Sequence, residues 1–254
     1  MRSSPLALVV SAVFSITASQ SLAIAANAIG EVTAALGTPT ASGPSGDRKL
    51  TAGAPVYEDD KISVGSGNAQ ITLGDGTRLV VGPGSTLVLD RFLMTGGNSA
   101  QKISIKALRG TFRFITGRSA KEAYTIQTAN ATIGIRGTGF DFWSKQQTGV
   151  AVLDGSVRLC QGDNCVNLRE GCEVGRAGDD EARKLTGRAK GAAIGNNLPY
   201  ILNQTSLRTA FRLPIQDCRS SLSRTRDSSG DNGESRKSQN GRGSPDRGNN
   251  NNND

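Results

Sequence analysis

The chain has 254 residues and a net charge of +8, with 32 glycines, 4% aromatic residues and no histidine. The missing histidine excludes Ser-His-Asp and Cys-His catalytic sites, histidine-ligated zinc and a histidine proton shuttle. Abundant glycine with few aromatic residues is typical of short strands joined by glycine turns, so the composition predicts an all-β protein and argues against a helical bundle.

Residues 1–28 are predicted to be a signal peptide. Arg2 supplies a positive start, residues 6–16 are a short and mostly apolar run, and residues 23–28 hold two small-residue cleavage sites. The apolar run is shorter than the roughly 20 residues that a membrane-spanning helix needs, so cleavage is favoured over an uncleaved anchor. With no later candidate span in the sequence, we expect the mature chain to be periplasmic or secreted.

Residues 29–175 are predicted to form one β-domain. In the clearest hairpin, the alternating apolar and polar run 69–73 precedes Asp75-Gly76, a pair preferred in tight turns because glycine accepts a positive φ. Other strand-like runs lie at 29–36, 62–64, 79–81, 86–89, 103–107 and 112–115 and within 124–159. The sequence therefore predicts a two-layer antiparallel sandwich or a short irregular β-roll.

Four corners share the order charged residue, glycine, hydroxyl residue. They are Asp75-Gly76-Thr77, Arg109-Gly110-Thr111, Arg136-Gly137-Thr138 and Asp154-Gly155-Ser156. Their irregular spacing excludes a solenoid with equal rungs. Asp75, Asp154 and Asp163 are candidate acid–base carboxylates or calcium ligands, but Asp-Gly pairs usually serve turn geometry, and that interpretation is favoured.

The four cysteines, Cys160, Cys165, Cys172 and Cys218, are expected to be paired, because disulfides are the default in an exported chain. Their spacing fits neither a zinc knuckle nor a redox CxxC motif. Three pairings are open, and Cys160–Cys165 with Cys172–Cys218 is favoured. The first pair flanks a predicted hairpin turn at 161–164, and the second would tie the C-terminal segment to the β-domain.

Arg136 is the most informative single residue of the predicted β-domain. If its strand face is buried, the guanidinium must meet a carboxylate or several carbonyls, and Asp141 and Asp154 are the candidate carboxylates. A structural ion pair at a strand corner is favoured over a ligand-binding arginine.

Aromatic residues cluster directly after this corner. Phe140 and Phe142 share one strand face, so we expect both in the core. Trp143 points to the opposite face, where it is a candidate partner contact or sugar-stacking residue, although core or rim packing is favoured.

The strand pattern fades after Cys172. Residues 176–218 are predicted to be a C-terminal segment that docks on the β-domain. In it, Asp179-Asp180 can cap a short helix over 181–185, and the apolar residues of 198–213 suit a helix or an extended arm. Residues 219–254 contain one leucine and no other large apolar residue, so we expect a disordered polar tail.

Residues 128–140, TANATIGIRGTGF, closely resemble the T-x-x-A-x-x-G-[VI]-R-G-T-x-F signature of FecR domains. The residues that carry the resemblance are Gly134, Arg136, Gly137, Thr138 and Phe140, followed by Asp154 and Gly155 in a V-x-x-G-x-V strand. Shorter matches upstream extend it over residues 29–159. The resemblance implies a small all-β extracytoplasmic domain used for protein interaction and signal sensing.

Together these features predict a non-enzymatic exported protein that binds a partner in the cell envelope. An envelope protein is the expected partner and an anionic polymer a second candidate, with no nucleic acid, metal or cofactor expected. Two alternatives stay open. One is an accessory in envelope signal transduction or sigma-factor regulation that acts through a separate membrane protein, and the other is a protein that binds anionic polysaccharide.

Overall fold

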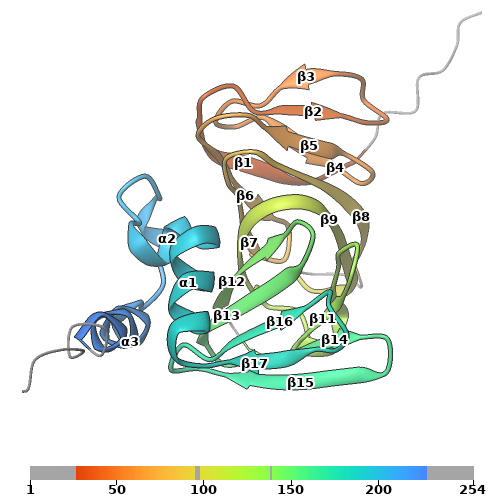
Figure 1. Cartoon of the computed structure of the whole chain (residues 1–254). Helices are drawn as coiled ribbons and strands as arrows, with labels where there is room; N and C mark the ends of the chain where they lie inside the picture. Colours follow the sequence, from red (N-terminus) through yellow and green to blue (C-terminus); the bar gives the residue numbers. More distant parts are fainter. Residues whose placement is uncertain (1–26, 95–97, 138, 228–254) are drawn as a thin grey trace, which may run out of the picture.

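The computed structural model describes residues 27–94, 98–137 and 139–227 and confirms the predicted all-β fold (Figure 1). The strands are β1 (Ala28–Leu36), β2 (Thr40–Ser42), β3 (Arg48–Lys49), β4 (Pro55–Tyr57), β5 (Lys61–Val64), β6 (Asn68–Leu73), β7 (Arg78–Val81), β8 (Ser85–Met94), β9 (Ala100–Ile115), β10 (Tyr124–Gln127), β11 (Thr132–Ile135), β12 (Gly139–Ser144), β13 (Thr148–Asp154), β14 (Ser156–Gln161), β15 (Asn164–Arg169), β16 (Val174–Ala177) and β17 (Arg183–Leu185). The helices are η1 (Lys121–Ala123), α1 (Gly187–Asn197), α2 (Pro199–Leu202), η2 (Thr209–Phe211) and α3 (Gln216–Asp227).

The strands form a continuous mixed sheet that is folded into two layers sharing β9. The first layer has the order β4–β1–β6–β7–β9–β12–β13–β16–β17. The second has the order β3–β2–β5–β8–β9–β10–β11–β14–β15. The N-terminal part of β9 pairs in the second layer, and its last six residues, 110–115, pair in the first. One long strand therefore ties the two layers together.

Gly110 lies where β9 passes between the layers. Its φ of 116° is in the region that favours glycine. A Cβ at this position would lie 2.1 Å from Ser85 Oγ, so a side chain is excluded by space as well as by backbone conformation. The glycine corner predicted at 109–111 is thus the point at which the chain changes layer.

The antiparallel prediction needs one correction, the parallel pair of β9 and β10. Ile103 lies opposite Tyr124, and Lys106 lies opposite Gln127. After β9 ends in the first layer, the chain crosses through the short helix η1 and re-enters the second layer beside the start of β9. Parallel neighbours require such a crossover rather than a hairpin, and the sequence pattern carries no sign of it.

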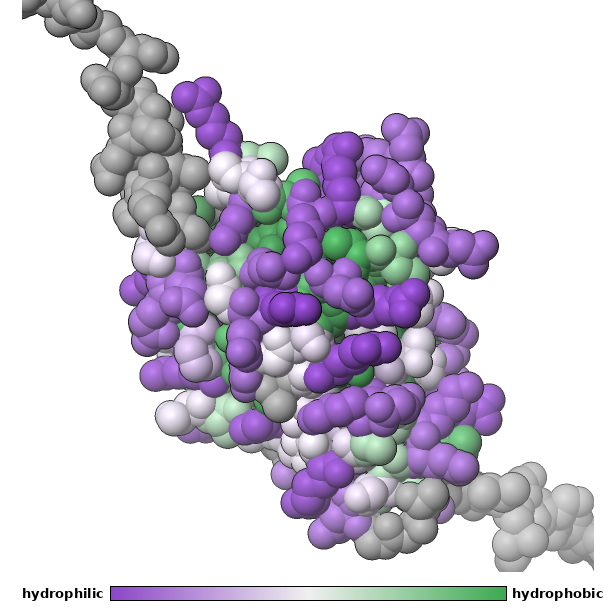
Figure 2. Space-filling model, turned by 90° about the horizontal axis from the view of Figure 1, so that it is seen from below, coloured by the Kyte–Doolittle hydropathy of each residue, from purple (hydrophilic) through white to green (hydrophobic). Residues whose placement is uncertain are grey.

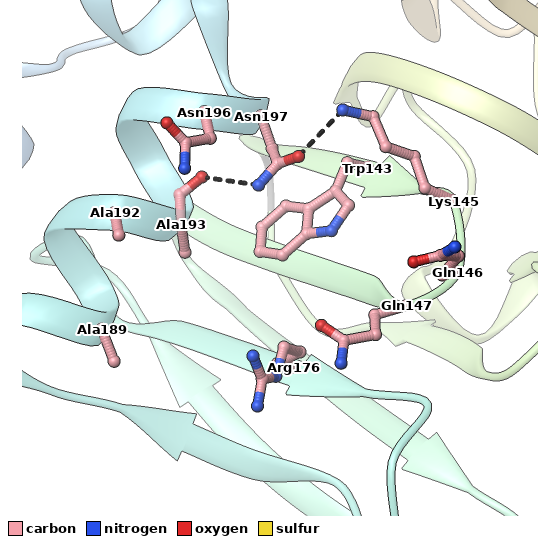
Figure 3. Close-up of a pocket in the computed structure, with 10 residues that line it drawn as sticks. All are labelled: Trp143, Lys145, Gln146, Gln147, Arg176, Ala189, Ala192, Ala193, Asn196 and Asn197. Atoms are coloured by element: carbon pink, nitrogen blue, oxygen red, sulfur yellow. Dashed lines mark hydrogen bonds between the residues drawn. The ribbon is translucent and has the colours of Figure 1, made fainter.

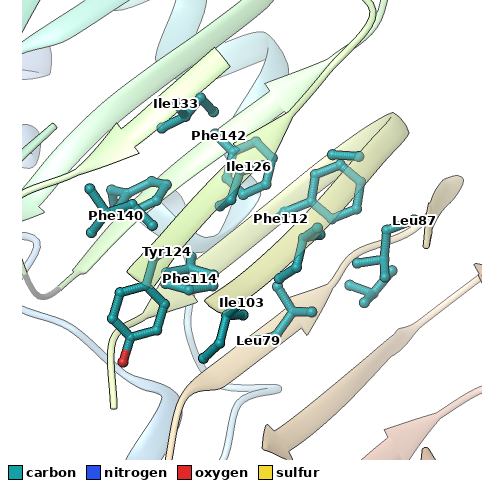
Figure 4. Packing of buried hydrophobic residues seen from close by; sticks show 14 of the residues in the cluster. Leu79, Leu87, Ile103, Phe112, Phe114, Tyr124, Ile126, Ile133, Phe140 and Phe142 are labelled. Carbon is teal, nitrogen blue, oxygen red and sulfur yellow. The ribbon is translucent and has the colours of Figure 1, made fainter. Parts of the chain in front are cut away.

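Aromatic rings fill the space between the layers, as expected for Phe140 and Phe142 (Figure 4). Phe112 stacks on Phe142 with ring centroids 4.9 Å apart, and Phe114 stacks on Phe140 at 5.5 Å. Each stacked pair also consists of directly opposed residues on β9 and β12. Such cross-strand aromatic pairs add about 0.5–1.5 kcal/mol beyond their buried area, so they help to fix this register.

The C-terminal segment covers the outer face of the first layer, with the helices α1, α2 and α3 on one side of the strands (Figure 1). This cover explains why β12 is buried along its whole length instead of on alternate residues. Trp143, Val174 and Ile194 meet in one apolar cluster, and Val80, Tyr200 and Phe211 form another. Residues 198–213 therefore dock as two short helical turns and connecting loops.

The short helix expected over 181–185 is instead the edge strand β17. Its residues pair with β16, with Leu185 opposite Val174 and Arg183 opposite Arg176. Asp179, expected at a helix cap, forms an ion pair with Arg176 at 2.8 Å. The edge of β16 offers backbone hydrogen-bond partners to residues 183–185. A five-residue helix would be less stable than this pairing, because an isolated helical turn is costly to nucleate.

Both predicted disulfides, Cys160–Cys165 and Cys172–Cys218, are confirmed. The first closes the β14–β15 hairpin, and the second joins the end of the β-domain to helix α3. Residues 219–227, expected at the start of the tail, complete α3. This helix is held by the disulfide, by the packing of Leu222 and by a hydrogen bond of 2.7 Å from Arg219 Nη2 to the Leu202 carbonyl. Residues 1–26 and 228–254 lie outside the described residues.

Hydrophilic residues cover most of the surface seen from below (Figure 2). Hydrophobic residues show on this face only in small areas between them. No helix among the described residues is long and apolar enough to cross a membrane.

Candidate functional site

The motif around Arg136 forms the corner between β11 and β12. The Arg136 amide donates a hydrogen bond of 2.9 Å to the Ser156 carbonyl. Gly137 packs against the backbone of the next motif so closely that a Cβ would lie 2.1 Å from Ser156 N and 2.6 Å from Gly155 Cα. Gly155 itself has a φ of 77°. The two motifs that carry the family resemblance therefore pack directly against each other.

The remaining motif residues divide between core and surface. Phe140 is fully buried in the aromatic core, whereas Asp154 is exposed. Gly134 lies in β11 with an ordinary extended backbone. Thr138 lies outside the described residues.

Arg136 does not form the ion pair that the sequence suggests. Its side chain is exposed, and Asp141 is occupied by Arg113 instead. The physical reason is strand alternation: Ile135 points inward, so the next side chain points out to solvent.

Arg136 borders a cleft of about 590 Å³ on the outer face of the second layer. Its floor is made by residues that face each other across neighbouring strands, with Thr125 opposite Gly134 and Gly134 opposite Arg158. Lys121 and Glu122 from η1 close one side, and Tyr124 and Ile135 complete the lining. We call this space the motif cleft.

Three of the residues that line the motif cleft are cationic: Lys121, Arg136 and Arg158. The Lys121 ammonium donates a hydrogen bond of 3.0 Å to Thr116 Oγ1, which holds it at the edge of the cleft. Both arginines are exposed, and neither guanidinium has a salt-bridge partner in the part of the chain that the structure describes. With Glu122 as the one acidic residue in the lining, the cleft has an excess of positive charge.

Trp143 lies beneath helix α1 and is only 4% exposed (Figure 3). Its indole lies over Gly149 on β13, where an added Cβ would be 1.9 Å from the ring. Beside it, Asn197 joins the helix to the strands by accepting a hydrogen bond of 3.0 Å from Lys145 Nζ and donating one of 3.1 Å to the Ala193 carbonyl. Trp143 is therefore a packing residue between sheet and helix, and the favoured rim or core interpretation describes its position.

A cavity of about 400 Å³ opens beside the indole edge (Figure 3). The lining residues are mainly amides, cations and alanines from the β12–β13 turn and α1, namely Trp143, Lys145, Gln146, Gln147, Arg176, Ala189, Ala192, Ala193, Asn196 and Asn197. Since the indole face itself is covered by Gly149, the cavity does not offer the open aromatic platform that sugar stacking needs.

A buried polar cluster joins the first layer to the C-terminal segment. The Arg113 guanidinium donates to both carboxylate oxygens of Asp141, from Nε at 2.6 Å and from Nη2 at 2.8 Å. Its Nη1 donates to Gln204 Oε1 and, at 3.2 Å, to the Phe211 carbonyl. Burial, together with the negative charge of Asp141, raises the pKa of the nearby Tyr200 hydroxyl. The Arg113 guanidinium is therefore committed to structural contacts.

Asp75 is also committed to structure. One carboxylate oxygen accepts hydrogen bonds of 2.9 Å from Thr77 Oγ1, 2.7 Å from Ser119 Oγ and 2.7 Å from the Tyr124 hydroxyl. Burial raises the pKa of Tyr124, which keeps the hydroxyl a donor. The favoured turn interpretation of Asp75 thus agrees with its contacts, while Asp163 is exposed in the β14–β15 turn.

Sequence reasoning missed the two cations that share the motif cleft with Arg136. Arg158 follows the Gly155 motif by three residues, and Lys121 lies in a segment without a pattern. Only the strand register brings them together, and the register depends on long-range pairing. The described residues contain no group of three or more histidine, cysteine or acidic side chains placed to hold a metal ion.

Comparison with protein families gives a match of residues 60–158 to the model described as FecR protein. Comparison with curated proteins gives no match. Two crystal structures of a candidate anti-sigma factor from Parabacteroides distasonis ATCC 8503, at 1.65 and 2.50 Å resolution, are similar to the chain with 20% identity and a TM-score of 0.41. The similarity covers 53% and 52% of this chain but only 63% and 62% of theirs, less than two thirds of their length.

Proposed function

Because residues 60–158 carry a FecR domain, we propose that the protein is an exported, non-enzymatic binding module that contacts a protein partner in the cell envelope and takes part in envelope signalling. The FecR match is the observation that carries this proposal. It spans the corner at Arg136 and the Gly155 motif that packs on it, and it includes Arg136 and Arg158 of the motif cleft.

The two disulfides support a site of action outside the cytoplasm, where such bonds persist. We propose that residues 1–28 are removed as a signal peptide and that the mature chain is periplasmic or secreted. Binding rather than catalysis is supported by the state of the buried carboxylates. Asp75 and Asp141 accept hydrogen bonds from fixed neighbours, which leaves them without the freedom of a general base.

The experiment is crosslinking of the tagged protein in its native envelope, followed by competition with untagged protein. We expect one envelope protein to be captured saturably and released by the competitor. Deletion of the gene, with transcript measurement and complementation, tests the signalling role. A discrete set of transcripts should change and be restored. Capture that does not saturate, together with an unchanged transcript profile, would contradict the proposal.

A further inference from the structure

We propose that the motif cleft binds an acidic segment of the partner protein, with the guanidinium groups of Arg136 and Arg158 as the carboxylate-binding groups. This inference rests on the proposed partner-binding function. It places the partner contact in the motif cleft and assigns recognition to pairing between carboxylates and guanidinium groups.

The first observation is that a glycine stands at position 134, where the backbone does not require one. Its backbone is extended and outside the left-handed region, so conformation does not require glycine there. A Cβ would be 3.8 Å from the Arg158 carbonyl oxygen and 3.9 Å from Arg158 Cβ, which is ordinary van der Waals contact. Glycine within a strand weakens the strand, and such a position often marks close approach of a ligand or another backbone. The missing side chain leaves the floor of the motif cleft open.

The second observation is the charge above that floor. Arg158 lies directly across from Gly134 on β14, and Arg136 follows two residues later on the same chain segment. Both are exposed, and the salt bridges of the described residues do not include them. The guanidinium fork matches the two oxygens of a carboxylate, so two such groups beside an open floor suit an acidic peptide.

The lining favours a peptide over a dense polyanion. Glu122 lies at the edge of the cleft and lowers the net positive charge of the lining, which suits a segment with a few spaced carboxylates better than a polymer charged at every unit. Tyr124 and Ile135 are only 2% and 4% exposed, so contact with a ligand falls to the polar and charged side chains of the lining. The volume of about 590 Å³ lies within the range of ordinary ligand pockets, roughly 300–1,000 Å³.

The test is an NMR titration of the full-length protein at low ionic strength with the capped peptide Glu-Gly-Glu-Gly-Glu. The neutral peptide Gln-Gly-Gln-Gly-Gln is the control. We expect the acidic peptide alone to shift the amide signals of Thr125, Ile135 and Arg136. The double variant Arg136→Gln/Arg158→Gln should bind about tenfold more weakly. The matched variant Arg109→Gln/Arg169→Gln, which removes the same charge from exposed strand positions elsewhere, should bind like the wild type.

Gly134→Val separates the open floor from the charge. We expect it to fold with an unchanged or higher melting temperature, because valine suits a strand, and yet to bind the peptide about tenfold more weakly. The inference would be overturned if the acidic peptide did not bind, if Gly134→Val bound like the wild type, or if the two double variants lost affinity equally. Preferential binding of polygalacturonate or inorganic phosphate at the same signals would also overturn it.

The native-envelope crosslinking distinguishes this inference from the function on which it rests. If Arg136→Gln/Arg158→Gln still captures the partner, the motif cleft is not the contact but the proposed function stands. If the wild type captures no partner and deletion leaves the transcript profile unchanged, the proposed function fails, whatever the peptide titration shows.

Discussion

The Arg113 guanidinium and the Asp141 carboxylate, directly opposed on β9 and β12, form a two-bond ion pair in which both residues are 0% exposed. The pair faces the C-terminal segment, and Gln204 from that segment completes it. Gln204 and the Phe211 carbonyl accept the remaining hydrogen bonds of the guanidinium, so the docked segment both buries the ion pair and completes its hydrogen bonding.

Replacing Arg113 with Met should lower the free energy of unfolding by about 3–5 kcal/mol, because Asp141 would remain buried without its partner. Urea denaturation followed by circular dichroism measures this change. Arg176→Met is the matched control, since it breaks the half-exposed pair with Asp179 and should cost about 0–1 kcal/mol. The double variant Arg113→Met/Asp141→Leu should recover much of the loss. Equal losses of unfolding free energy in Arg113→Met and Arg176→Met would show that the buried ion pair stabilises the fold no more than the half-exposed pair does.

Removing the Cys172–Cys218 disulfide by paired serine substitutions should destabilise the protein by about 4 kcal/mol, because the bond closes a loop of 46 residues. The Cys160–Cys165 bond closes only 5 residues, and its removal should cost about 2 kcal/mol. Thermal unfolding of the two double variants compares these values. Hydrogen exchange should show faster opening of α3 in the first variant alone. A larger loss from the short loop would contradict the loop-entropy account.

The stability of the protein should fall as pH rises above about 10, because the unfolded chain releases tyrosine protons there. Burial raises the pKa of Tyr200 in the folded state above that value, so the folded protein keeps the Tyr200 proton when the unfolded chain loses it. The stabilisation that this proton provides is therefore complete below pH 10 and is lost as the pH rises above it. Tyr200→Phe should flatten this decline, with Tyr124 responsible for what remains. At neutral pH the same variant should be as stable as the wild type or more stable, since the buried hydroxyl has no hydrogen-bond partner among the described residues. Parallel stability curves above pH 10 would refute the assignment.

Gly137 and Gly134 should respond oppositely to alanine. Gly137→Ala places a Cβ against the backbone of Gly155 and Ser156 and should cost about 1–3 kcal/mol. Gly134→Ala meets only ordinary contacts and should leave stability unchanged or slightly raised. Melting temperatures of the two variants provide the comparison. Similar losses at both positions would mean that both glycines of the motif serve packing.

Local patterns in the sequence predict the strands well where neighbours in the chain are also neighbours in space. The Asp75-Gly76 hairpin and the first disulfide depend on pairing over a few residues, and both are present. The same is true of the aromatic alternation that puts Phe140 and Phe142 in the core. In each case a turn motif or a two-residue hydrophobic period in the sequence is enough to predict the feature.

Features that depend on distant pairing could not be predicted in this way. The interpretation of Arg136 as an ion-paired residue failed because its side chain points to solvent, and because Asp141, one of its two candidate partners, pairs with Arg113 on β9, 28 residues away. The strand β17 replaced a predicted helix because β16 offered an open edge, which local propensity cannot report. The motif cleft needs Lys121, Gly134 and Arg158 from three elements, so it appears only once the register is known.

Strand β9 also limits how the molecule can change shape. Its residues bond to the second layer at one end and to the first layer at the other, and a hinge between the layers would have to separate the buried side chains packed between them, such as Phe114 and Tyr124, whose ring centroids are 5.7 Å apart. Opening of one layer against the other is therefore an improbable way to pass on a binding event. If the protein takes part in signalling as proposed, we expect a binding event to be passed on through loops, through helix α3 or through the choice of bound molecule, without relative motion of the two layers.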